Sequence, residues 1–345
     1  MPPCEAALPA RPGAATLGAQ AGRAGGEAKR RMQAAQMFHP QFEAKALLAA
    51  ARRVRLGGDA PSRDALAGGY RAAYRGTGIE YEESREYVPG DDVAAMDWKV
   101  TARLGRPFVK RFREERARTV MLAVDVSPSM AAGGQAGGVA YCAALAAVVL
   151  AVSVAASRDR VGLVLFSDRV EAFLPPGKGP GQAHAVAAAL AGARPVGRGT
   201  DPGPALALVA SVVPHRSPVF VFSDCAAADC VTPLGRLAAR HEVTAGFVAG
   251  VAAPPLPLRG VVEFVEAESS RRAVCDFADA AARARFAAAG EERRRRTVAG
   301  LRAAGVGVVE LDPAAHPAPA LDAYFRARRR PGVRAPGGAP GSPRG

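Results

Sequence analysis

Three short polar clusters at the ends of apolar or helical segments carry the side chains best suited to chemistry. Residues 125–129 (DVSPS) and 223–224 (SD) each close an apolar run of strand length, and residues 199–201 (GTD) lie just before a helical run. Their donors are carboxylates and hydroxyls, which suit Mg²⁺ with its preference for octahedral oxygen coordination, whereas zinc and copper favour histidine and cysteine. The sequence therefore predicts a Mg²⁺ site, with Mn²⁺ as the alternative metal.

A metal held by few charged ligands stays electrophilic and keeps one coordination position open. An Asp or Glu carboxylate from another protein can fill that position. The competing interpretation is helix capping, because Ser, Thr and Asp are preferred N-cap residues. The occurrence of all three clusters at strand or helix ends favours the metal site.

These clusters need a scaffold that brings strand ends together, and the surrounding sequence predicts one. From residue 119 onward, apolar runs alternate with alanine-rich helical runs, which is typical of right-handed crossovers and a parallel sheet. We expect a Rossmann-like α/β fold with a central, mainly parallel sheet and helices on both faces, in which ligands bind beyond the carboxyl ends of the strands. The expected strands are 119–126, 160–167 with an edge hairpin at 170–174, 218–223, 243–248, 261–266, 273–276 and 307–311, and the expected helices are 137–157, 182–193, 202–213, 233–240 and 278–304.

The chain divides into regions by composition. Residues 137–156 carry no charge and are long enough to span a bilayer, but a strand with polar site residues comes before them, so we predict a buried helix and no membrane span. The predicted regions are a disordered leader at 1–37, an N-terminal segment at 38–118, the α/β domain at 119–313, a C-terminal helix at 314–330 and a disordered tail at 331–345.

Charge and cysteine content limit the partners and the compartment. The net charge of +14 makes nucleic acid a conceivable partner, but the arginine runs lie in the tails and on one helix and are not interleaved with aromatic residues. We therefore favour a protein partner over nucleic acid. Five cysteines without regular spacing indicate free thiols, which fit a cytoplasmic protein.

The three clusters resemble the metal-ion-dependent adhesion site (MIDAS) of the von Willebrand factor A domain. Asp125, Ser127 and Ser129 match its Asp-x-Ser-x-Ser motif, Thr200 matches its threonine ligand and Asp224 its last aspartate. In that family the serines and the threonine usually touch the metal, and the aspartates act mainly through water. The resemblance implies a von Willebrand A fold with Mg²⁺ at these five residues and no catalytic residue.

Residues 78–103 resemble the signature of the bacterial family called domain of unknown function 58 (DUF58). Its pattern is an acidic and aromatic stretch, then Arg-x-Tyr-x-Pro-Gly-Asp-Asp, Asp-Trp and Ala-Arg, and it lies just before the Asp-x-Ser-x-Ser strand, as here. The resemblance extends over residues 38–330, but Ala94 and Ala95 stand where the family usually has one or two basic residues. The matching residues are Arg85, Tyr87, Pro89, Gly90, Asp91, Asp92, Asp97, Trp98, Ala102 and Arg103.

The signature has a structural and a functional interpretation. Pro89 and Gly90 predict a turn, and the nearby aspartates suit either turn and capping roles or an interaction surface. Trp98, the only tryptophan, is expected to anchor this segment against the α/β domain.

The family resemblance implies a non-enzymatic protein that works beside a MoxR-type AAA+ ATPase as an adaptor or chaperone-like partner. An acidic residue of a protein ligand would bind the metal. Two alternatives stay open. One is a metal-dependent hydrolase using the same oxygen cluster, for which no general base can be placed. The other is nucleic-acid binding through the arginine-rich segments.

Overall fold

The chain forms two compact units, residues 1–73 with 119–345 and residues 74–118, and each is described by itself. The structure is a computed structural model. It describes residues 15–18, 42–53, 62–74, 79–114, 117–131, 138–214, 216–225, 229–248, 261–266, 272–276 and 278–328.

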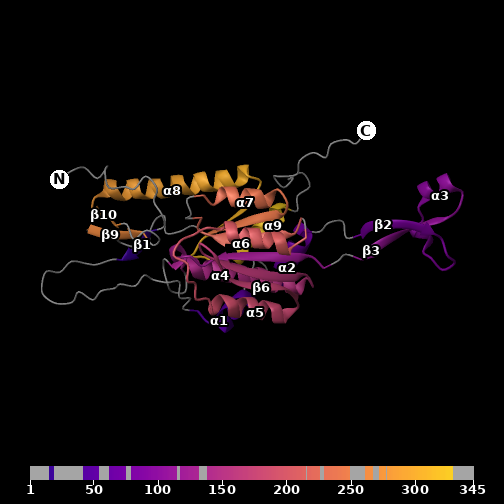
Figure 1. The fold of residues 1–345 in the computed structure, drawn as a ribbon, viewed down its shortest axis with the longest axis horizontal. Coiled ribbons are helices and arrows are strands. Elements are labelled where there is room, and N and C mark those ends of the chain that lie inside the picture. The colour runs from indigo at the N-terminus through magenta and orange to yellow at the C-terminus, as the bar shows by residue number, and fades with distance from the viewer. Residues whose placement is uncertain are drawn as a thin grey trace. The chain divides into compact units, whose positions relative to one another are not determined.

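The larger unit is built on a six-stranded sheet in the order β11-β8-β7-β4-β5-β6. Its edge strand β6 is labelled in Figure 1. All neighbouring strands are parallel except β6, which pairs antiparallel with β5 at the edge. In chain order this is the doubly wound arrangement of Rossmann-like sheets. The strands are β4 (Thr119–Asp125), β5 (Arg160–Phe166), β6 (Val170–Lys178), β7 (Pro218–Ser223), β8 (Glu242–Val248) and β11 (Gly307–Leu311).

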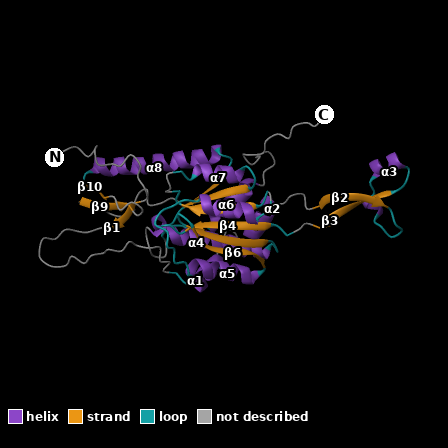
Figure 2. Ribbon diagram, in the orientation of Figure 1, coloured by secondary structure: helices purple, strands orange, loops and turns teal. Residues whose placement is uncertain are grey.

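Helices cover both faces of this sheet, so the predicted mixed α/β architecture is confirmed (Figure 2). On one face pack α1 (Ala44–Arg52), α4 (Val139–Ala156) and α5 (Pro180–Ala191). On the other face α6 (Gly203–Val212), α7 (Val231–Ala238) and α8 (Ala280–Ala303) share a core with the strands. Two further helices are α2 (Ser62–Tyr74) and α9 (Ala318–Arg328). The ring of Phe325 in α9 lies edge-on to Tyr70 and Phe220, 6.0 and 6.2 Å away, so α2 and α9 join the α4 face.

Helix α4 is the predicted uncharged segment. Among the described helices it has the length and apolar composition of a bilayer span, but 78% of it is buried inside the protein. It contacts β4, β5, β7 and β8, and its small alanine side chains let it lie close to the sheet. The site-bearing strand β4 is thus covered on one face by an apolar helix.

Two predictions are corrected in this unit. Strands β9 (Val261–Glu266) and β10 (Arg272–Asp276) pair antiparallel with each other and do not join the central sheet. Within the predicted disordered leader 1–37, β1 (Ala15–Gly18) pairs with the other edge of β9. The free edge of β9 presents backbone N–H and C=O groups that need hydrogen-bond partners. The composition of residues 1–37 does not show that part of this segment supplies them. The rest of the leader and the tail 331–345 lie outside the described residues.

The smaller unit is an antiparallel hairpin with a helical insertion. Strands β2 (Ile79–Glu86) and β3 (Phe108–Glu114) pair around η2 (Val93–Ala95) and α3 (Trp98–Leu104). The predicted segment 38–118 is therefore divided, because α1 and α2 belong to the larger unit.

Candidate metal site

The carboxyl ends of β4 and β7 meet in the middle of the central sheet, where Val124 pairs with Phe222. The chain runs outward from β4 through β5 and β6 on one side, and from β7 through β8 and β11 on the other. The boundary between β4 and β7 is therefore the topological switch point, where open α/β sheets bind their ligands. Two of the three predicted polar clusters follow these two strands.

Five residues from these strand ends form a buried polar cluster. The carboxylate of Asp125 accepts hydrogen bonds from Ser127 N–H at 2.9 Å and from Ser223 Oγ at 2.6 Å. The hydroxyl oxygens of Ser127 and Ser129 lie 3.0 Å apart, and Ser129 Oγ donates to Asp224 Oδ1 at 3.4 Å. All five side chains are buried. The structure thus brings clusters 125–129 and 223–224 into one group.

The loop after β4 holds the two serines in place. Val126 N–H donates to the carbonyl of Phe166 on the neighbouring strand at 2.8 Å, and Met130 N–H donates to Ser127 O at 3.1 Å. The short helix η3 (Pro128–Ala131) begins at Pro128, whose ring presets the required φ angle. Met130 is fully buried and fixes the far end of the loop.

The electrostatics of this group are unfavourable for two negative charges. Burial and the neighbouring Asp224 carboxylate raise the pKa of Asp125 to about 7, although hydrogen bonds from Ser127 and Ser223 oppose the shift. An opposite charge within a few ångströms would favour the ionised form and lower this pKa. A cation between the two carboxylates would therefore relieve the main electrostatic cost of the cluster.

Thr200, the predicted third contributor, lies at the same edge of the sheet. It is partly exposed and borders a small cavity together with Ser223. The neighbouring Asp201 is exposed and accepts Gly203 N–H at 2.8 Å, just before α6. The cavity is lined by Phe166, Thr200, Pro202, Val221, Ser223, Cys225, Cys230, Leu234 and Ala245.

The donor set fits a hard divalent cation. Two carboxylates and three serine hydroxyls share the cluster, and these are the oxygen ligands that Mg²⁺ and Mn²⁺ accept. Cys225 follows Asp224, but its hydrogen bond with Cys230 and its burial raise the pKa of the thiol well above the usual range, so a thiolate ligand is disfavoured. In the described part of the chain, no group of three or more His, Cys, Asp or Glu side chains could hold a metal. Hydroxyl donors would therefore be essential here.

Several residues that hold this site were missed from the sequence. Arg293 of α8 donates to the carbonyl of Cys225 at 3.1 Å, next to Asp224, whereas Ser223, which bonds Asp125 directly, belongs to the predicted cluster 223–224. Asp168 and Glu171 contact the loop that carries Thr200. The Ser-Asp pair 167–168 lies at the end of strand β5, as the pair 223–224 lies at the end of β7. A search for polar residues at strand ends could therefore have identified Asp168. The long-range contact of Arg293 had no sequence signal.

In the smaller unit, the signature residues around the turn support one another. Arg85 forms an ion pair with Asp91 at 2.5 Å, and the other oxygen of Asp91 accepts Val88 N–H at 3.0 Å. The hydrogen bond from Val88 N–H has the larger effect and that from Arg85 the smaller one, and both lower the pKa of Asp91. Gly90 has a φ of +110°, a conformation that favours glycine. Tyr87 N–H donates to Pro107 O at 2.9 Å, so Pro89 and Gly90 form the predicted turn between anchored ends.

Asp97 has an equally structural position in this unit. Its carboxylate accepts the N–H groups of Lys99 and Val100 at the start of α3, and Ser84 Oγ donates to it at 2.8 Å. It is buried and acts as the N-cap of the helix. The contacts of Asp91 and Asp97 favour the structural interpretation for these two aspartates.

Other signature residues face solvent. Trp98 is 66% exposed, so the smaller unit does not bury its side chain. As the first residue of α3 it lies on a helix without buried residues. Asp92 and Arg103 are exposed as well. Ala95 lies in η2, beside the turn.

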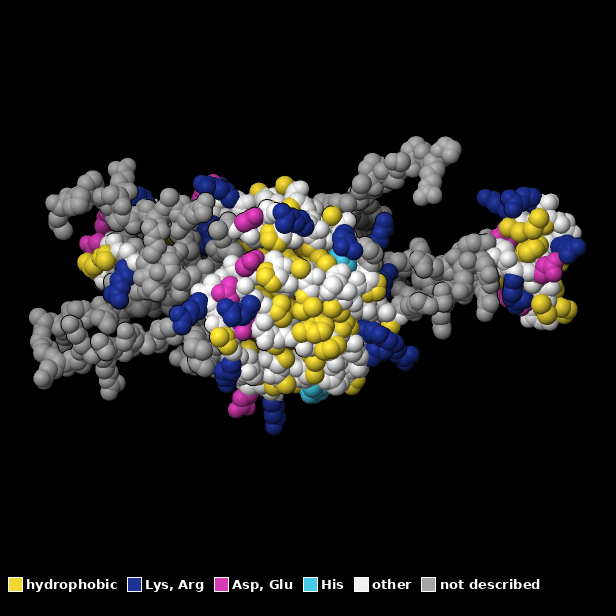
Figure 3. All heavy atoms as spheres, in the orientation of Figure 1, with side chains coloured by type: hydrophobic (Ala, Val, Ile, Leu, Met, Phe, Trp, Pro, Cys, Tyr) yellow, Lys and Arg dark blue, Asp and Glu magenta, His cyan; other side chains and the backbone are white. Residues whose placement is uncertain are grey.

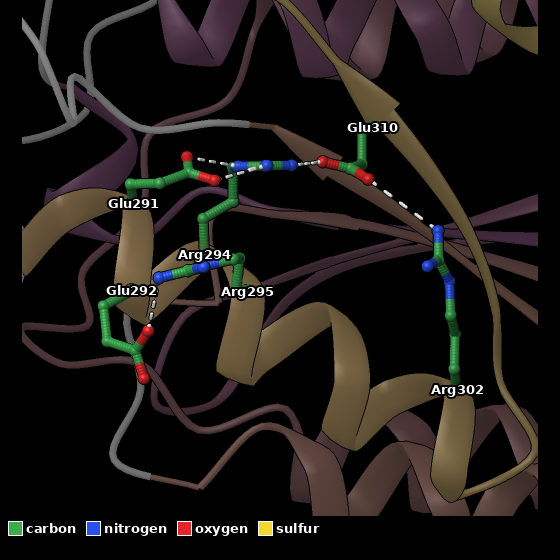
Figure 4. A network of polar contacts seen from close by, with 6 residues as sticks. All are labelled: Glu291, Glu292, Arg294, Arg295, Arg302 and Glu310. Atoms are coloured by element: carbon green, nitrogen blue, oxygen red, sulfur yellow. Dashed lines mark hydrogen bonds and ion pairs between the residues drawn. The ribbon is translucent and has the colours of Figure 1, made fainter. Parts of the chain in front are cut away.

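The arginine run on α8 is mostly paired (Figure 4). Arg294 lies between Glu291, at 2.7 Å, and Glu310 of β11, which Arg302 also approaches at 3.8 Å. Glu292 pairs with both Arg295 and Arg296, at 2.8 and 2.7 Å. On the visible face, lysine and arginine side chains are scattered and often lie beside acidic ones (Figure 3). The run thus has local partners of opposite charge.

Comparison with known proteins identifies relatives of uncharacterized function. Residues 83–296 match the family model described as Protein of unknown function DUF58. The uncharacterized proteins Mb1516 of Mycobacterium bovis and Rv1480 of Mycobacterium tuberculosis are each 30% identical over 250 residues, covering 71% of this chain and 78% of the relative.

Two solved structures show a weaker likeness. The conserved hypothetical protein BatB from Bacteroides thetaiotaomicron has a TM-score of 0.41 and 17% identity, covering 61% of this chain and 98% of that one. An aerotolerance-related membrane protein from Bacteroides fragilis has a TM-score of 0.38 and 18% identity, covering 62% and 98%.

Proposed function

The chain belongs to the DUF58 family, and we propose that it is a non-enzymatic interaction module whose metal site binds an acidic group of a partner protein. The observation that carries this proposal is the buried oxygen cluster around Asp125 and Asp224. It lies at the position where α/β sheets bind ligands. Two buried carboxylates that repel each other form a poor structural core but a good cation site.

The proposed fold is a von Willebrand A domain, with Asp125, Ser127, Ser129, Thr200 and Asp224 as its metal-binding residues. The strand order and the meeting of the two polar clusters support this assignment. When bound, Mg²⁺ or Mn²⁺ would supply a Lewis-acidic centre that accepts a carboxylate. The serine hydroxyls would orient toward the metal, and Asp125 would be held ionised by Ser127 N–H and Ser223 Oγ.

The proposed partner is a MoxR-type AAA+ ATPase or a protein that it remodels. This step rests on the family resemblance, and it places the protein in the cytoplasm. An acidic residue on the partner would complete the metal coordination, as the site's shortage of charged ligands requires. Nucleic acid is not the proposed partner, because the arginines of α8 already pair with Glu291, Glu292 and Glu310.

The proposal is tested by partner binding with and without metal. The MoxR-type ATPase of the same organism is titrated onto immobilised wild-type protein in Mg²⁺ and in EDTA. The same titration is made with Asp125→Ala and with the control Asp279→Ala, which removes the N-cap of α8 and an exposed ion pair with Arg285. We expect binding that needs Mg²⁺, that Asp125→Ala abolishes and that Asp279→Ala retains.

Full binding of Asp125→Ala in EDTA would contradict the mechanism. Hydrolysis of a phosphoester by wild type, lost in Asp125→Ala, would instead support the enzymatic alternative.

A further inference from the structure

Two acidic side chains near the start of β6 hold the loop that carries Thr200. Glu171 uses both carboxylate oxygens: Oε2 accepts Val196 N–H at 3.0 Å and Oε1 accepts Gly197 N–H at 2.7 Å. Ser167 Oγ donates to the same Oε1 at 2.5 Å. Hydrogen bonds to an ionised acceptor are stronger than neutral ones. The first half of the loop is thereby tied to the β5–β6 turn.

The second half of the loop is tied to the same turn. Asp168 accepts Arg198 N–H at 3.2 Å, and Asp201 N–H donates to the carbonyl of Ser167 at 2.9 Å. Asp168 is itself held by Arg169, whose Nε lies 2.9 Å from it. Four backbone N–H groups on both sides of Thr200 therefore bond to residues 167–171.

The loop also packs tightly against this turn. A Cβ atom placed on Gly197 would collide with Ser167 Oγ and Asp168 Oδ1, whereas one on Gly199 would make only ordinary contacts with Asp168, at 3.7 Å and beyond. Gly197 is therefore required for the close approach. The chain here has no helical or strand hydrogen bonds of its own, because α5 ends at Ala191 and α6 begins at Gly203. Its position depends on the contacts to the turn.

Both carboxyl groups are suited to this role. Burial opposes ionisation of Glu171, but the bonds from Ser167, Val196 and Gly197 outweigh it and lower the pKa of the side chain. The bond from Arg169, followed by those from the loop backbone, lowers the pKa of Asp168 despite some desolvation. Both side chains are therefore ionised near neutral pH.

We propose that Asp168 and Glu171 are positioning residues for the metal site, and that they hold residues 196–201 so that Thr200 is presented to the metal. This inference rests on the proposed function. Ordering a free loop costs about 1–2 kcal/mol of backbone entropy per residue, which metal binding would otherwise have to supply. Neither carboxylate needs to touch the metal, because each acts through the loop backbone.

The test compares Glu171→Gln and Asp168→Asn with a matched control, Asp279→Asn. Asp279 also accepts two backbone N–H groups, those of Ala281 and Ala282, but at the start of α8. The first readout is amide hydrogen exchange in EDTA. We expect faster exchange at Val196 and Gly197 in Glu171→Gln and at Arg198 in Asp168→Asn, with no change there in the control. Unchanged exchange in both variants would overturn the positioning role.

The second readout is Mn²⁺ affinity, measured by electron paramagnetic resonance of the free ion. We expect Glu171→Gln to weaken Mn²⁺ binding about tenfold and the control to leave it unchanged. In a Thr200→Ala background, Glu171→Gln should have no further effect, because its influence passes through Thr200. An undiminished tenfold loss in that background would overturn the inference.

The two readouts separate this inference from the proposed function. A wild-type protein that binds no Mn²⁺ would overturn the metal site, and with it the role assigned to Thr200. The exchange data from the metal-free protein would still decide whether the carboxylates hold the loop.

Discussion

The two units of this protein use aspartate in opposite ways. In the smaller unit, Asp91 is paired with Arg85 and Val88 N–H, and Asp97 accepts two backbone N–H groups and a serine hydroxyl. In the larger unit, Asp125 and Asp224 are buried close enough for one to raise the pKa of the other. The first pair stabilises a turn and a helix end.

This difference shows that an acidic motif is defined by what surrounds it. Backbone N–H groups and a guanidinium satisfy the negative charge in the smaller unit, so nothing further is required there. In the larger unit hydroxyls and an amide leave the repulsion between carboxylates in place, and a cation is the simplest compensation.

Replacing Asp125 by Asn should stabilise the metal-free protein. Asn keeps the shape of the side chain and one accepting oxygen for Ser127 N–H, whereas its amide NH₂ would have to donate to Ser223 Oγ; the change removes one of two buried charges. Because one pKa unit corresponds to about 1.4 kcal/mol and the pKa of Asp125 is raised from 3.8 to about 7, the gain should be on the order of a few kcal/mol above neutral pH. Urea unfolding in EDTA measures it. A gain that does not grow as the pH rises from 3.8 to about 7 would contradict the raised pKa of Asp125.

Replacing Gly197 by Ala should weaken both the fold and metal binding. The new Cβ collides with Ser167 and Asp168, and overpacking of this kind costs about 1–3 kcal/mol. Gly199→Ala is the matched control, since its Cβ meets only ordinary contacts. Urea unfolding and Mn²⁺ titration of both variants provide the measurement. Equal stability and equal Mn²⁺ affinity of the two variants would argue against close packing of the loop on residues 167–168.

Replacing Asp97 by Ala should destabilise the smaller unit without affecting metal binding. Loss of an N-cap costs about 1 kcal/mol, and Ser84 also loses its acceptor. We expect faster amide exchange at Lys99 and Val100, with Mn²⁺ affinity unchanged. A fall in Mn²⁺ affinity would break the contrast between the two units, because it would give Asp97 a functional role.

The smallest effect concerns the titration of Asp91. Its pKa in the folded protein is below the ordinary 3.8, so its contribution to stability is complete above that value and is lost as pH falls through the lower, folded pKa. A carboxyl titration followed by nuclear magnetic resonance should give a midpoint below 3.8. Arg85→Gln removes the ion pair and should move that midpoint upward. An unchanged midpoint would mean that Arg85 does not stabilise the charge.

Much of the fold followed from the sequence because its strands are buried on both faces. The predicted strand 218–223 coincides with β7, whose six residues are all buried, and the continuous apolar run predicts such a strand directly. Position after a strand likewise predicted that residues 125–129 and 223–224 would meet. Strand β1 was missed because its partner, β9, is more than two hundred residues away in the chain and pairs through backbone groups of any sequence.

The finer features of the site were harder to predict. Arg293 reaches the carbonyl of Cys225 from a distant helix, and no local pattern marks one arginine among four as different. Glu171 binds backbone N–H groups, which every non-proline residue has, so the sequence does not show which residues it contacts.

The most direct test of the central claim is thermal unfolding of wild type and Asp125→Asn, each in Mg²⁺, Mn²⁺ and EDTA. A metal that binds only the folded state raises its stability by roughly 2.7 kcal/mol when its concentration is about one hundred times Kd. We expect a higher Tm for wild type in metal than in EDTA, and no such difference for Asp125→Asn. An equal shift in both proteins, or no shift in wild type at millimolar metal, would contradict a metal site at Asp125.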